Sequence, residues 1–423
     1  MTWLQRYRLR SFLRNSAWLP PLVGLVAALL TNRLMWSADR LLGWQARVGV
    51  EGSRIVLTAL ASSMLTFIVF VFSILLLAVQ LASAQLTPRI IATFFRNRIL
   101  KLSLAIFVFV FTFDLALLVR IDESVPRLSV WLAIYSSVAS IGVFLYMIDK
   151  VGKTLRPVSI LTAIGRQGHD VIEDVYPNPV TAAVSAAVPA PGPPAGDRPR
   201  IVVNSRPGVV LAFDPTGLAA LARQADCVIE VVPQVGDFIA TGDPLFRLHG
   251  GGGGGDVEDR DLQQSIAIGP ERTMEQDPAF AFRIIVDIAA KALSPAINDP
   301  TTAVLAIDQL HHLLRSAGHR DLDTGQVRDE SGRLRLVYRT PNWDDLVALA
   351  VTEIRHYGKD SIQIARRLRA MLESLIPAVP EERAVRLREE LDLLRRMVDR
   401  NFADAEDRTR ADRADSLGIG GAP

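Results

Sequence analysis

The amino-acid sequence changes character near residue 150. Four long apolar stretches precede that point, and charged sequence of mixed composition follows it. Averages over the whole chain hide this division, because 49% hydrophobic residues and a formal net charge of +2 are ordinary for a globular protein. We therefore predict a membrane-anchored protein that carries its own water-soluble domain.

Each apolar stretch has about the length of a membrane-spanning helix. Residues 56–82, 102–119 and 128–148 consist mainly of Leu, Ile, Val, Phe and Ala, and about 20 such residues cross the ~30 Å hydrocarbon core. Residues 18–36 are the weakest candidate because Arg33 interrupts them, although a tryptophan at each end fits an interfacial aromatic belt. A soluble four-helix bundle would need a polar face on each helix, which these stretches lack.

The basic residues predict the orientation of these spans. They cluster before the first span, between the second and third, and after the fourth: Arg6, Arg8, Arg10 and Arg14; Arg89, Arg96, Arg98 and Lys101; Lys150, Lys153 and Arg156. With four spans the three clusters share one side, so the positive-inside rule places both termini in the cytoplasm. Arg40, Arg47 and Arg54 weaken this bias without reversing it. The single cysteine, Cys227, agrees with a reducing compartment.

The second span carries polar residues on one helical face. Their spacing of four, four, seven and seven residues keeps them in one stripe: Thr58, Ser62, Thr66, Ser73 and Gln80. Such a stripe suits close helix packing, within a subunit or between subunits. It can also line a water-filled path when several copies surround an axis. Packing is the commoner of the two explanations.

Asp114 lies inside the third span, where an ionisable group must face protein or water rather than lipid. Two interpretations stay open. The carboxyl group binds a cation or relays protons, or it accepts a hydrogen bond from a serine of the fourth span, such as Ser136 or Ser140.

A polar motif follows the second span. Pro88 disfavours helical geometry at the residue before it, so the span bends or ends there. The motif combines amide and basic residues with Ile and Phe, as a short interfacial helix does: Gln85, Pro88, Arg89, Arg96 and Arg98. Anionic lipid head groups are its expected ligands, and a merely solvated basic turn is the alternative.

The soluble half divides at two breaks, a Pro/Ala-rich stretch at 176–199 and the glycine run 250–255. We predict strands at 209–213, 227–232, 238–240, 245–248 and 334–338, and a helical turn at 218–224. Helices are expected at 278–293, 301–316, 343–356, 361–375 and 382–408. The predicted regions are a four-span membrane domain (1–156), a connecting segment (157–199), a small β-module (200–249), a Gly-rich loop (250–257), a mainly helical α+β remainder (258–410) and a flexible tail (411–423).

The strand and turn order of the β-module, with Gly236-Asp237 and Gly242-Asp243-Pro244 between strands, is similar to one half of a biotinyl/lipoyl-like β-barrel. Such carrier domains attach their prosthetic group to a lysine, and no lysine lies between Lys153 and Lys291. The resemblance therefore implies an assembly or adaptor module without a cofactor.

Common catalytic motifs are missing from the sequence. No G-x-x-x-x-G-K-[ST], G-x-S-x-G or H-E-x-x-H occurs, and one cysteine cannot build a cysteine-based metal site. His311 and His312 are adjacent and make a poor chelating pair. We therefore predict no catalytic residue, no metal, no cofactor and no nucleic-acid partner.

The densest group of polar residues lies where one predicted helix ends and the next begins: Arg283, Asp287, Lys291, Ser294, Asn298 and Asp299. Backbone amides at the start of the second helix can hold an anion, assisted by Lys291 or Arg283. The alternative, which we favour, is that Asp299 caps its own helix and occupies that position itself.

Three separated segments resemble a family of bacterial predicted membrane proteins, domain-of-unknown-function family 2254. They are residues 79–89 (VQLASAQLTPR), 276–283 (QDPAFAFR) and 287–302 (DIAAKALSPAINDPTT). The resemblance covers nearly the whole chain, from the first span to about residue 400. It implies a bacterial inner-membrane protein with this two-part layout, and it brings no catalytic residues with it.

Three functions follow as hypotheses. The first is a homo-oligomeric channel- or transporter-like assembly whose soluble domains gate or assemble the membrane part. The second is a membrane-tethered sensor or scaffold that binds a cytoplasmic partner or a small ligand, near Lys291 and Asn298. The third is an enzyme that acts on a lipid at 88–98, which ranks last because a nucleophile–base pair is missing there.

Overall fold

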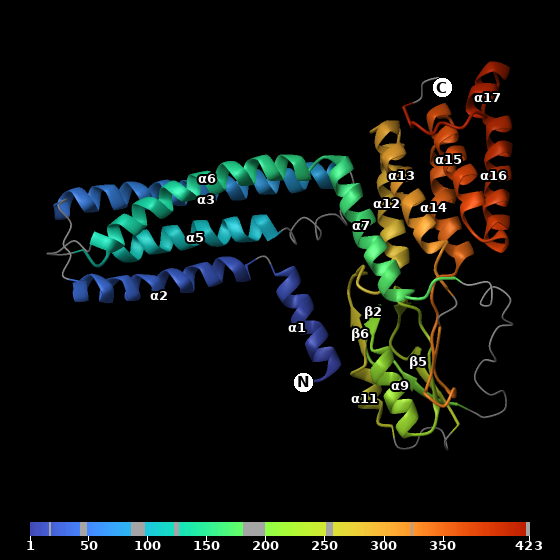
Figure 1. The fold of residues 1–423 in the computed structure, drawn as a ribbon, viewed down its shortest axis with the longest axis horizontal. Coiled ribbons are helices and arrows are strands. Elements are labelled where there is room, and N and C mark those ends of the chain that lie inside the picture. Colours follow the sequence, from blue (N-terminus) through green and yellow to red (C-terminus); the bar gives the residue numbers. More distant parts are fainter. Residues whose placement is uncertain are drawn as a thin grey trace. The chain divides into compact units, whose positions relative to one another are not determined.

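The computed structural model describes residues 1–16, 18–42, 49–85, 98–121, 127–180, 199–250, 257–322 and 325–419. The chain forms two compact units, Leu9–Ser159 and a second made of Met1–Arg8 with Ile160–Pro423 (Figure 1). They are called here the membrane unit and the soluble unit. Each is considered by itself.

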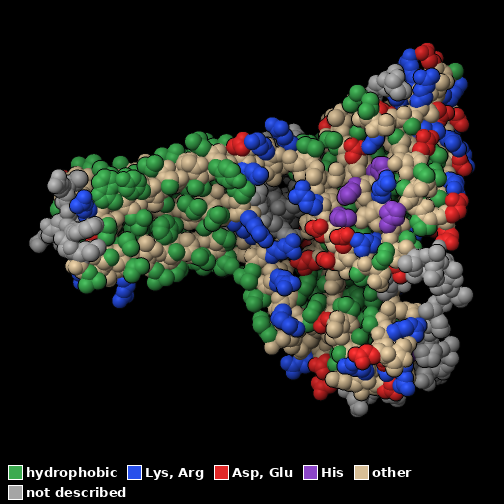
Figure 2. Space-filling model, viewed as in Figure 1, with side chains coloured by type: hydrophobic (Ala, Val, Ile, Leu, Met, Phe, Trp, Pro, Cys, Tyr) green, Lys and Arg blue, Asp and Glu red, His purple; other side chains and the backbone are tan. Residues whose placement is uncertain are grey.

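Long apolar helices build the membrane unit: α2 (Leu19–Leu42), α3 (Val50–Gln85), α5 (Arg98–Leu118) and α6 (Arg127–Thr154), preceded by α1 (Trp3–Asn15), which belongs to both units. Four of these are long and apolar enough to cross a membrane, as the sequence predicted. Hydrophobic side chains cover their outer surface, whereas charged side chains gather over the soluble unit (Figure 2). An apolar exterior of this kind is stable in lipid rather than in water.

The spans pack through small residues and aromatic side chains. A Cβ atom on Gly24 would lie 2.3 Å from the carbonyl oxygen of Ala105, so α2 and α5 approach closely only because this residue is glycine. Further along the bundle the rings of Phe67 and Phe107 pack on Phe144 from α6. Three helices therefore share one apolar core there.

Two small sheets form the β part of the soluble unit. Their strands are β1 (Arg200–Val203), β2 (Gly208–Phe213), β3 (Val228–Val231), β4 (Phe238–Ile239), β5 (Pro244–His249), β6 (Ile266–Gly269), β7 (Gln326–Arg328) and β8 (Leu334–Val337). The order is β1-β5-β3-β8-β7 in one sheet and β4-β2-β6 in the other. Strands β3 and β8 pair in parallel, with Ile229 opposite Leu336, whereas the other pairs among the described strands are antiparallel.

The five strands at 209–248 and 334–338 are confirmed apart from their ends, whereas β1, β6 and β7 were not predicted. Three strands of the two sheets come from outside residues 200–249. The likeness of that segment to half of a biotinyl/lipoyl-like barrel stays a prediction. Helices α9 (Pro215–Gln224) and α11 (Asp259–Gln263) accompany the sheets, and Leu218 and Leu262 are fully buried in their core.

Helices complete the soluble unit: α12 (Pro278–Ala292), α13 (Pro300–Ala317), α14 (Trp343–Tyr357), α15 (Ile362–Leu375), α16 (Glu381–Asn401) and α17 (Ala405–Ala411). The sequence predicted one helix over 382–408, but two helices occupy this segment. Phe402 adopts an extended conformation, and Asp404 then caps α17 by accepting hydrogen bonds from the amides of Glu406 and Asp407. The apolar periodicity alone predicted one continuous helix, but the extended Phe402 ends α16 and Asp404 starts a separate helix.

The C-terminal segment was predicted as a flexible tail from residue 411, but residues 412–418 are attached to α15. Arg366 and Arg367 donate to the backbone carbonyls of Arg413, Asp415 and Ser416. Arg369 forms an ion pair with Asp412. Since three buried or half-buried arginines of one helix hold it, this segment is part of the folded unit as far as residue 419.

Helix α7 (Pro157–Val175) occupies the start of the predicted connecting segment. It follows α6 after only two residues, and from Ile160 onward it belongs to the soluble unit. Its buried face includes Gly165 and Gly168, which lie against Gln309 of α13 and Ala281 of α12. The glycines were not identified from the sequence as a packing surface.

Replacing Gly168 by leucine is expected to lower the thermal midpoint of the full chain, by the equivalent of about 1–3 kcal/mol. A Cβ atom there would lie 2.8 Å from the Cβ atom of Ala281, which has no rotamer to adjust. The control is Gly152→Leu in α6, where nothing lies within 4 Å of an added Cβ atom. Equal shifts in the two variants would show that α7 does not depend on this contact.

Candidate functional site

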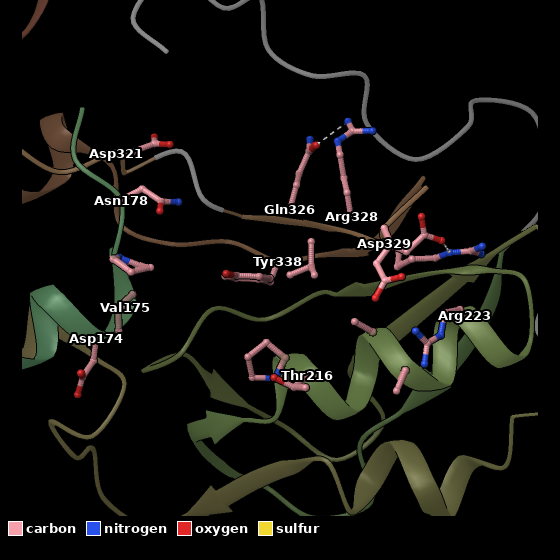
Figure 3. A pocket seen from close by; sticks show the side chains of 17 residues that line it. Asp174, Val175, Asn178, Thr216, Arg223, Asp321, Gln326, Arg328, Asp329 and Tyr338 are labelled. Atoms are coloured by element: carbon pink, nitrogen blue, oxygen red, sulfur yellow. Dashed lines mark hydrogen bonds and ion pairs between the residues drawn. The ribbon is translucent and has the colours of Figure 1, made fainter. Parts of the chain in front are cut away.

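The soluble unit contains a pocket of about 720 Å³. It lies between the end of α7, the start of α9 and the β7–β8 hairpin (Figure 3). Its charged and polar lining residues are Asp174, Asn178, Thr216, Arg223, Asp321, Gln326, Arg328, Asp329, Glu330, Arg335 and Tyr338. Segments from three distant parts of the sequence therefore build one site.

Local chain geometry places the α9 side of the pocket. Asp214 caps α9 by accepting a hydrogen bond from the amide of Gly217 at 3.0 Å, and Pro215 opens the first turn. Thr216 and Arg223 then lie about two turns apart on the pocket side of this helix. The cap fixes where α9 starts and thereby the position of Thr216 in the pocket wall.

A buried arginine holds the hairpin side. The guanidinium of Arg335 donates to Asp329 at 2.7 Å and to Asp226 at 2.9 Å, and the residue is 7% exposed. Hydrogen bonds from Ser331 and from Arg335 hold the pKa of Asp329 well below its usual range. The carboxylate therefore stays ionised and keeps the hairpin in place at neutral pH.

Charges of both signs line the pocket, and Asp329 lies toward the same end as Arg223 (Figure 3). Figure 3 shows Asp174, Asn178 and Asp321 toward one end and Arg223 toward the other, with the ring of Tyr338 between them. That ring packs edge-on against Phe213 at 5.0 Å between centroids. Among the described residues that line the pocket, none is Ser, Cys, His or Lys. Its composition suits binding of a small charged ligand better than nucleophilic catalysis.

A smaller cavity of about 250 Å³ shares Asp174, Val175, Pro215 and Tyr338 with this pocket. Residues 276–278, the start of the segment 276–283, form part of its wall. Gln276 bonds through its side-chain amide to both backbone groups of Phe213, at 3.0 and 3.1 Å. Gln276, just before α12, therefore joins this helix to strand β2.

Asp277, which is 1% exposed, caps α12 at the amide of Phe280 and accepts a hydrogen bond from Arg272 at 2.6 Å. Burial raises the pKa of Asp277, and the hydrogen bond from Arg272 opposes that rise. A structural role explains the first two residues of the motif, Gln276 and Asp277.

The predicted cytoplasmic motif lies away from this pocket. Arg283 donates to Asp287 at 2.7 Å and makes a bidentate pair with Glu353 of α14, at 2.6 and 2.9 Å. The Ser294 hydroxyl donates to the carbonyl of Lys291 at 2.7 Å. The pair of Arg283 and Glu353 joins α12 to α14, and the other two contacts are local to α12 and its end. None of the six motif residues lines the pocket.

The alternative that we favoured for Asp299 is confirmed. Asp299 accepts from the amide and the hydroxyl of Thr302, at 3.0 and 2.5 Å, and thereby caps α13. Asn298 before it has a positive φ of 48°, a conformation that Asn tolerates better than most residues. The carboxylate thus occupies the position that an anion would need.

The polar stripe of the second span is exposed along α3. Thr58, Ser62, Thr66, Ser73 and Gln80 all face outward. At about 100° per residue, they lie nearly opposite the buried face of α3, which includes Leu57, Ala61, Met64, Val71 and Leu75. The stripe therefore does not serve packing within the described membrane unit.

Asp114 is fully buried between α5 and α6. Its Oδ2 atom accepts a hydrogen bond from Ser137 at 3.2 Å. The predicted hydrogen bond from a serine of the fourth span is confirmed, but the donor is Ser137 rather than Ser136 or Ser140, which were named as examples. The Ser136 hydroxyl donates to the carbonyl of Ala133, and that of Ser140 contacts the carbonyl of Ser137 and the sulfur of Met64. A role for Asp114 in cation binding or proton transfer stays a prediction.

The membrane-interface motif is mostly outside the described residues. Pro88, Arg89 and Arg96 belong to the part of the chain for which the structure gives no account. Of Gln85 only the backbone is described, as the last residue of α3, and Arg98 is the exposed first residue of α5. The predicted lipid site there stays a prediction.

Sequence reasoning missed a second buried carboxylate, Asp39 of α2. It accepts hydrogen bonds from the amides of Leu128 and Ser129, at 2.9 and 3.2 Å, and from the Ser129 hydroxyl at 2.7 Å. Asp39 therefore caps α6 from another helix. An aspartate near the end of an apolar span was the available signal, because such a group needs a partner within the protein.

Comparisons with known proteins agree with this layout. The family model described as "Predicted membrane protein (DUF2254)" matches residues 14–374. Proteins of Mycobacterium bovis and Mycobacterium tuberculosis, each described as uncharacterized, are 28% identical to the chain over 421 residues, which is 96% of this chain and 80% of each relative. No solved structure matches the chain significantly. The chain therefore belongs to the DUF2254 family of predicted membrane proteins.

Proposed function

We propose that the protein is a homo-oligomeric, channel- or transporter-like assembly of a bacterial inner membrane, with both termini in the cytoplasm. The outward-facing polar stripe of α3 carries this proposal. Lipid is a poor neighbour for the side-chain amide of Gln80 and for the hydroxyl groups above it. A second copy, or water along an axis between copies, satisfies them better.

Hydrogen bonds within the stripe support the same proposal. The hydroxyls of Thr66 and Ser73 donate to backbone carbonyls one turn back, at 3.0 and 2.9 Å. Their donor capacity is thus used, while the oxygen lone pairs point outward as acceptors. A row of outward acceptors suits a water-filled path for a cation, or hydrogen bonds from a neighbouring subunit.

The soluble unit would act on the membrane part through α7. Only two residues separate α7 from α6, and the face of α7 that contains Gly165 and Gly168 lies against α12 and α13. A rigid helix docked in this way transmits movement of the soluble unit to the fourth span. The β-module would serve assembly or gating, and the 720 Å³ pocket is the place for a controlling ligand.

Particle mass and ion flux test the proposal. The chain in nanodiscs is expected to have the mass of several copies, and liposomes containing it are expected to pass K⁺ or Cl⁻ down a gradient. Thr66→Leu and Gln80→Leu are expected to reduce that flux severalfold. Ser63→Leu removes an exposed hydroxyl at the edge of the same face, about 60° from Thr66 and 100° from Ser62, and is expected to reduce the flux less than either variant. A monomer without flux would overturn the proposal.

A membrane-tethered sensor is the second candidate, and the pocket with charges of both signs favours it. In that case the chain passes nothing, and its soluble unit binds a small ligand or a cytoplasmic partner. Co-purification of one defined partner, lost when the residues after 150 are removed, would favour the sensor over the channel.

A further inference from the structure

Three arginines of the membrane unit converge on one hollow of about 780 Å³. Arg33 and Arg40 come from α2 and Arg120 from the turn after α5, and Trp36, Ser37 and Leu41 complete the lining. The α2 residues follow one another at three- and four-residue intervals, so they form one face of that helix. The site is therefore a groove along one face of α2, and Arg120 contributes to its lining.

The guanidinium groups have no carboxylate partner among the residues that the structure describes. Asp39, the acidic residue next to Arg40, is 6% exposed and already accepts three hydrogen bonds from the start of α6. Arg40 lies over the ring of Trp36, with its Cζ atom 5.5 Å from the ring centroid. Three positive charges and an aromatic platform thus remain available to a ligand.

The position of the groove relative to the membrane indicates which class of ligand fits it. Arg33 lies within the apolar window Leu19–Leu41, and Leu41 at its end is 88% exposed. Eight residues of helix separate them, or about 12 Å, which reaches from the head-group layer into the hydrocarbon edge. Leu30 and Leu34, each 64% exposed, flank this depth with apolar surface. A free phosphate ion would leave these leucine side chains without an apolar neighbour. A phospholipid supplies a phosphate for the arginines and acyl chains for the leucines.

The geometry points to a site for the phosphodiester head group of an anionic phospholipid, bound by Arg33, Arg40 and Arg120. Guanidinium groups bind phosphate through paired hydrogen bonds, which are shorter and stronger than those between neutral groups. In the proposed orientation this end of the bundle faces away from the cytoplasm. The positive-inside rule predicts few arginines on that side of the membrane, and a phosphate ligand explains why three occur there.

Native mass spectrometry tests the site. The full chain, released from nanodiscs of phosphatidylglycerol and phosphatidylcholine, is expected to retain one phosphatidylglycerol per copy. The variant R33Q/R40Q/R120Q is expected to retain at least about tenfold less, the change in affinity for losing one charge-assisted contact. R395Q/R396Q/R400Q removes the same charge from an exposed face of α16 and is expected to behave as wild type. Equal retention in all three proteins would overturn the site.

A second arm separates lipid from free phosphate. The delipidated chain is titrated with inorganic phosphate, and no saturable binding is expected. Saturable binding that the triple variant loses would overturn the lipid assignment. If the triple variant does not fold, R120Q alone carries the test, because Arg120 is the second residue after the end of α5 and is exposed. The readout requires neither an oligomer nor ion flux.

Discussion

Replacing Glu390 by alanine is expected to lower the free energy of unfolding by about 2–4 kcal/mol. Glu390 belongs to α16 and is 1% exposed. One carboxylate oxygen accepts from Arg386 at 2.8 Å, and the other lies 3.6 Å from Nε of Arg355 on α14. Without Glu390 the half-buried Arg355 keeps its charge between two packed helices and loses its counter-ion. The expected loss lies below that of a fully buried pair because both arginines retain some solvent access.

Glu389 is a matched control for this prediction. It bonds to the same arginine, with its Oε2 atom 2.8 Å from Nη1 of Arg386, but its side chain is 56% exposed. Glu389→Ala is expected to cost less than about 1 kcal/mol, as exposed ion pairs do. The two variants are compared by the midpoints of thermal and urea-induced unfolding of the full chain in nanodiscs. Equal losses would mean that burial does not determine the contribution of these carboxylates.

Local chemistry explains which elements the sequence predicted well. The start of α13 was expected because Asp299 and Pro300 form a capping signal within two residues, and the structure confirms it. The four candidate spans followed from apolar windows alone. Their ends did not, because α3 begins at Val50, before the apolar window at 56, and an apolar window does not record where a helix begins.

Contacts between distant residues explain most of what the sequence did not predict. Strand β8 pairs with β3 about a hundred residues earlier, and no local pattern near Leu336 indicates that partner. The 720 Å³ pocket combines the end of α7, α9 and the hairpin for the same reason. The periodicity of α3 predicted one polar face, but only the packed bundle shows that this face points outward.

Asp39→Leu is expected to lower the stability of the membrane unit by about 3 kcal/mol, because a charged acceptor contributes ~1.5–3 kcal/mol per hydrogen bond. The first backbone amides of a helix lack partners in that helix, and Asp39 supplies them for Leu128 and Ser129 at the start of α6. Leucine removes the acceptor in a place that water reaches poorly, so the amides stay unsatisfied.

The substitution Asp39→Asn distinguishes the contribution of the hydrogen-bond acceptor from that of the negative charge. Asp39→Asn keeps one side-chain oxygen for the amides and loses the carboxylate, so it is expected to cost less than half as much as Asp39→Leu. Unfolding titrations of the full chain in mixed micelles with increasing SDS measure both losses. Equal losses would show that charge rather than the acceptor decides. Unchanged stability would show that α6 does not need this cap. Since α6 continues into α7 after two residues, a loosened start of α6 would also weaken the connection through which the soluble unit is proposed to act.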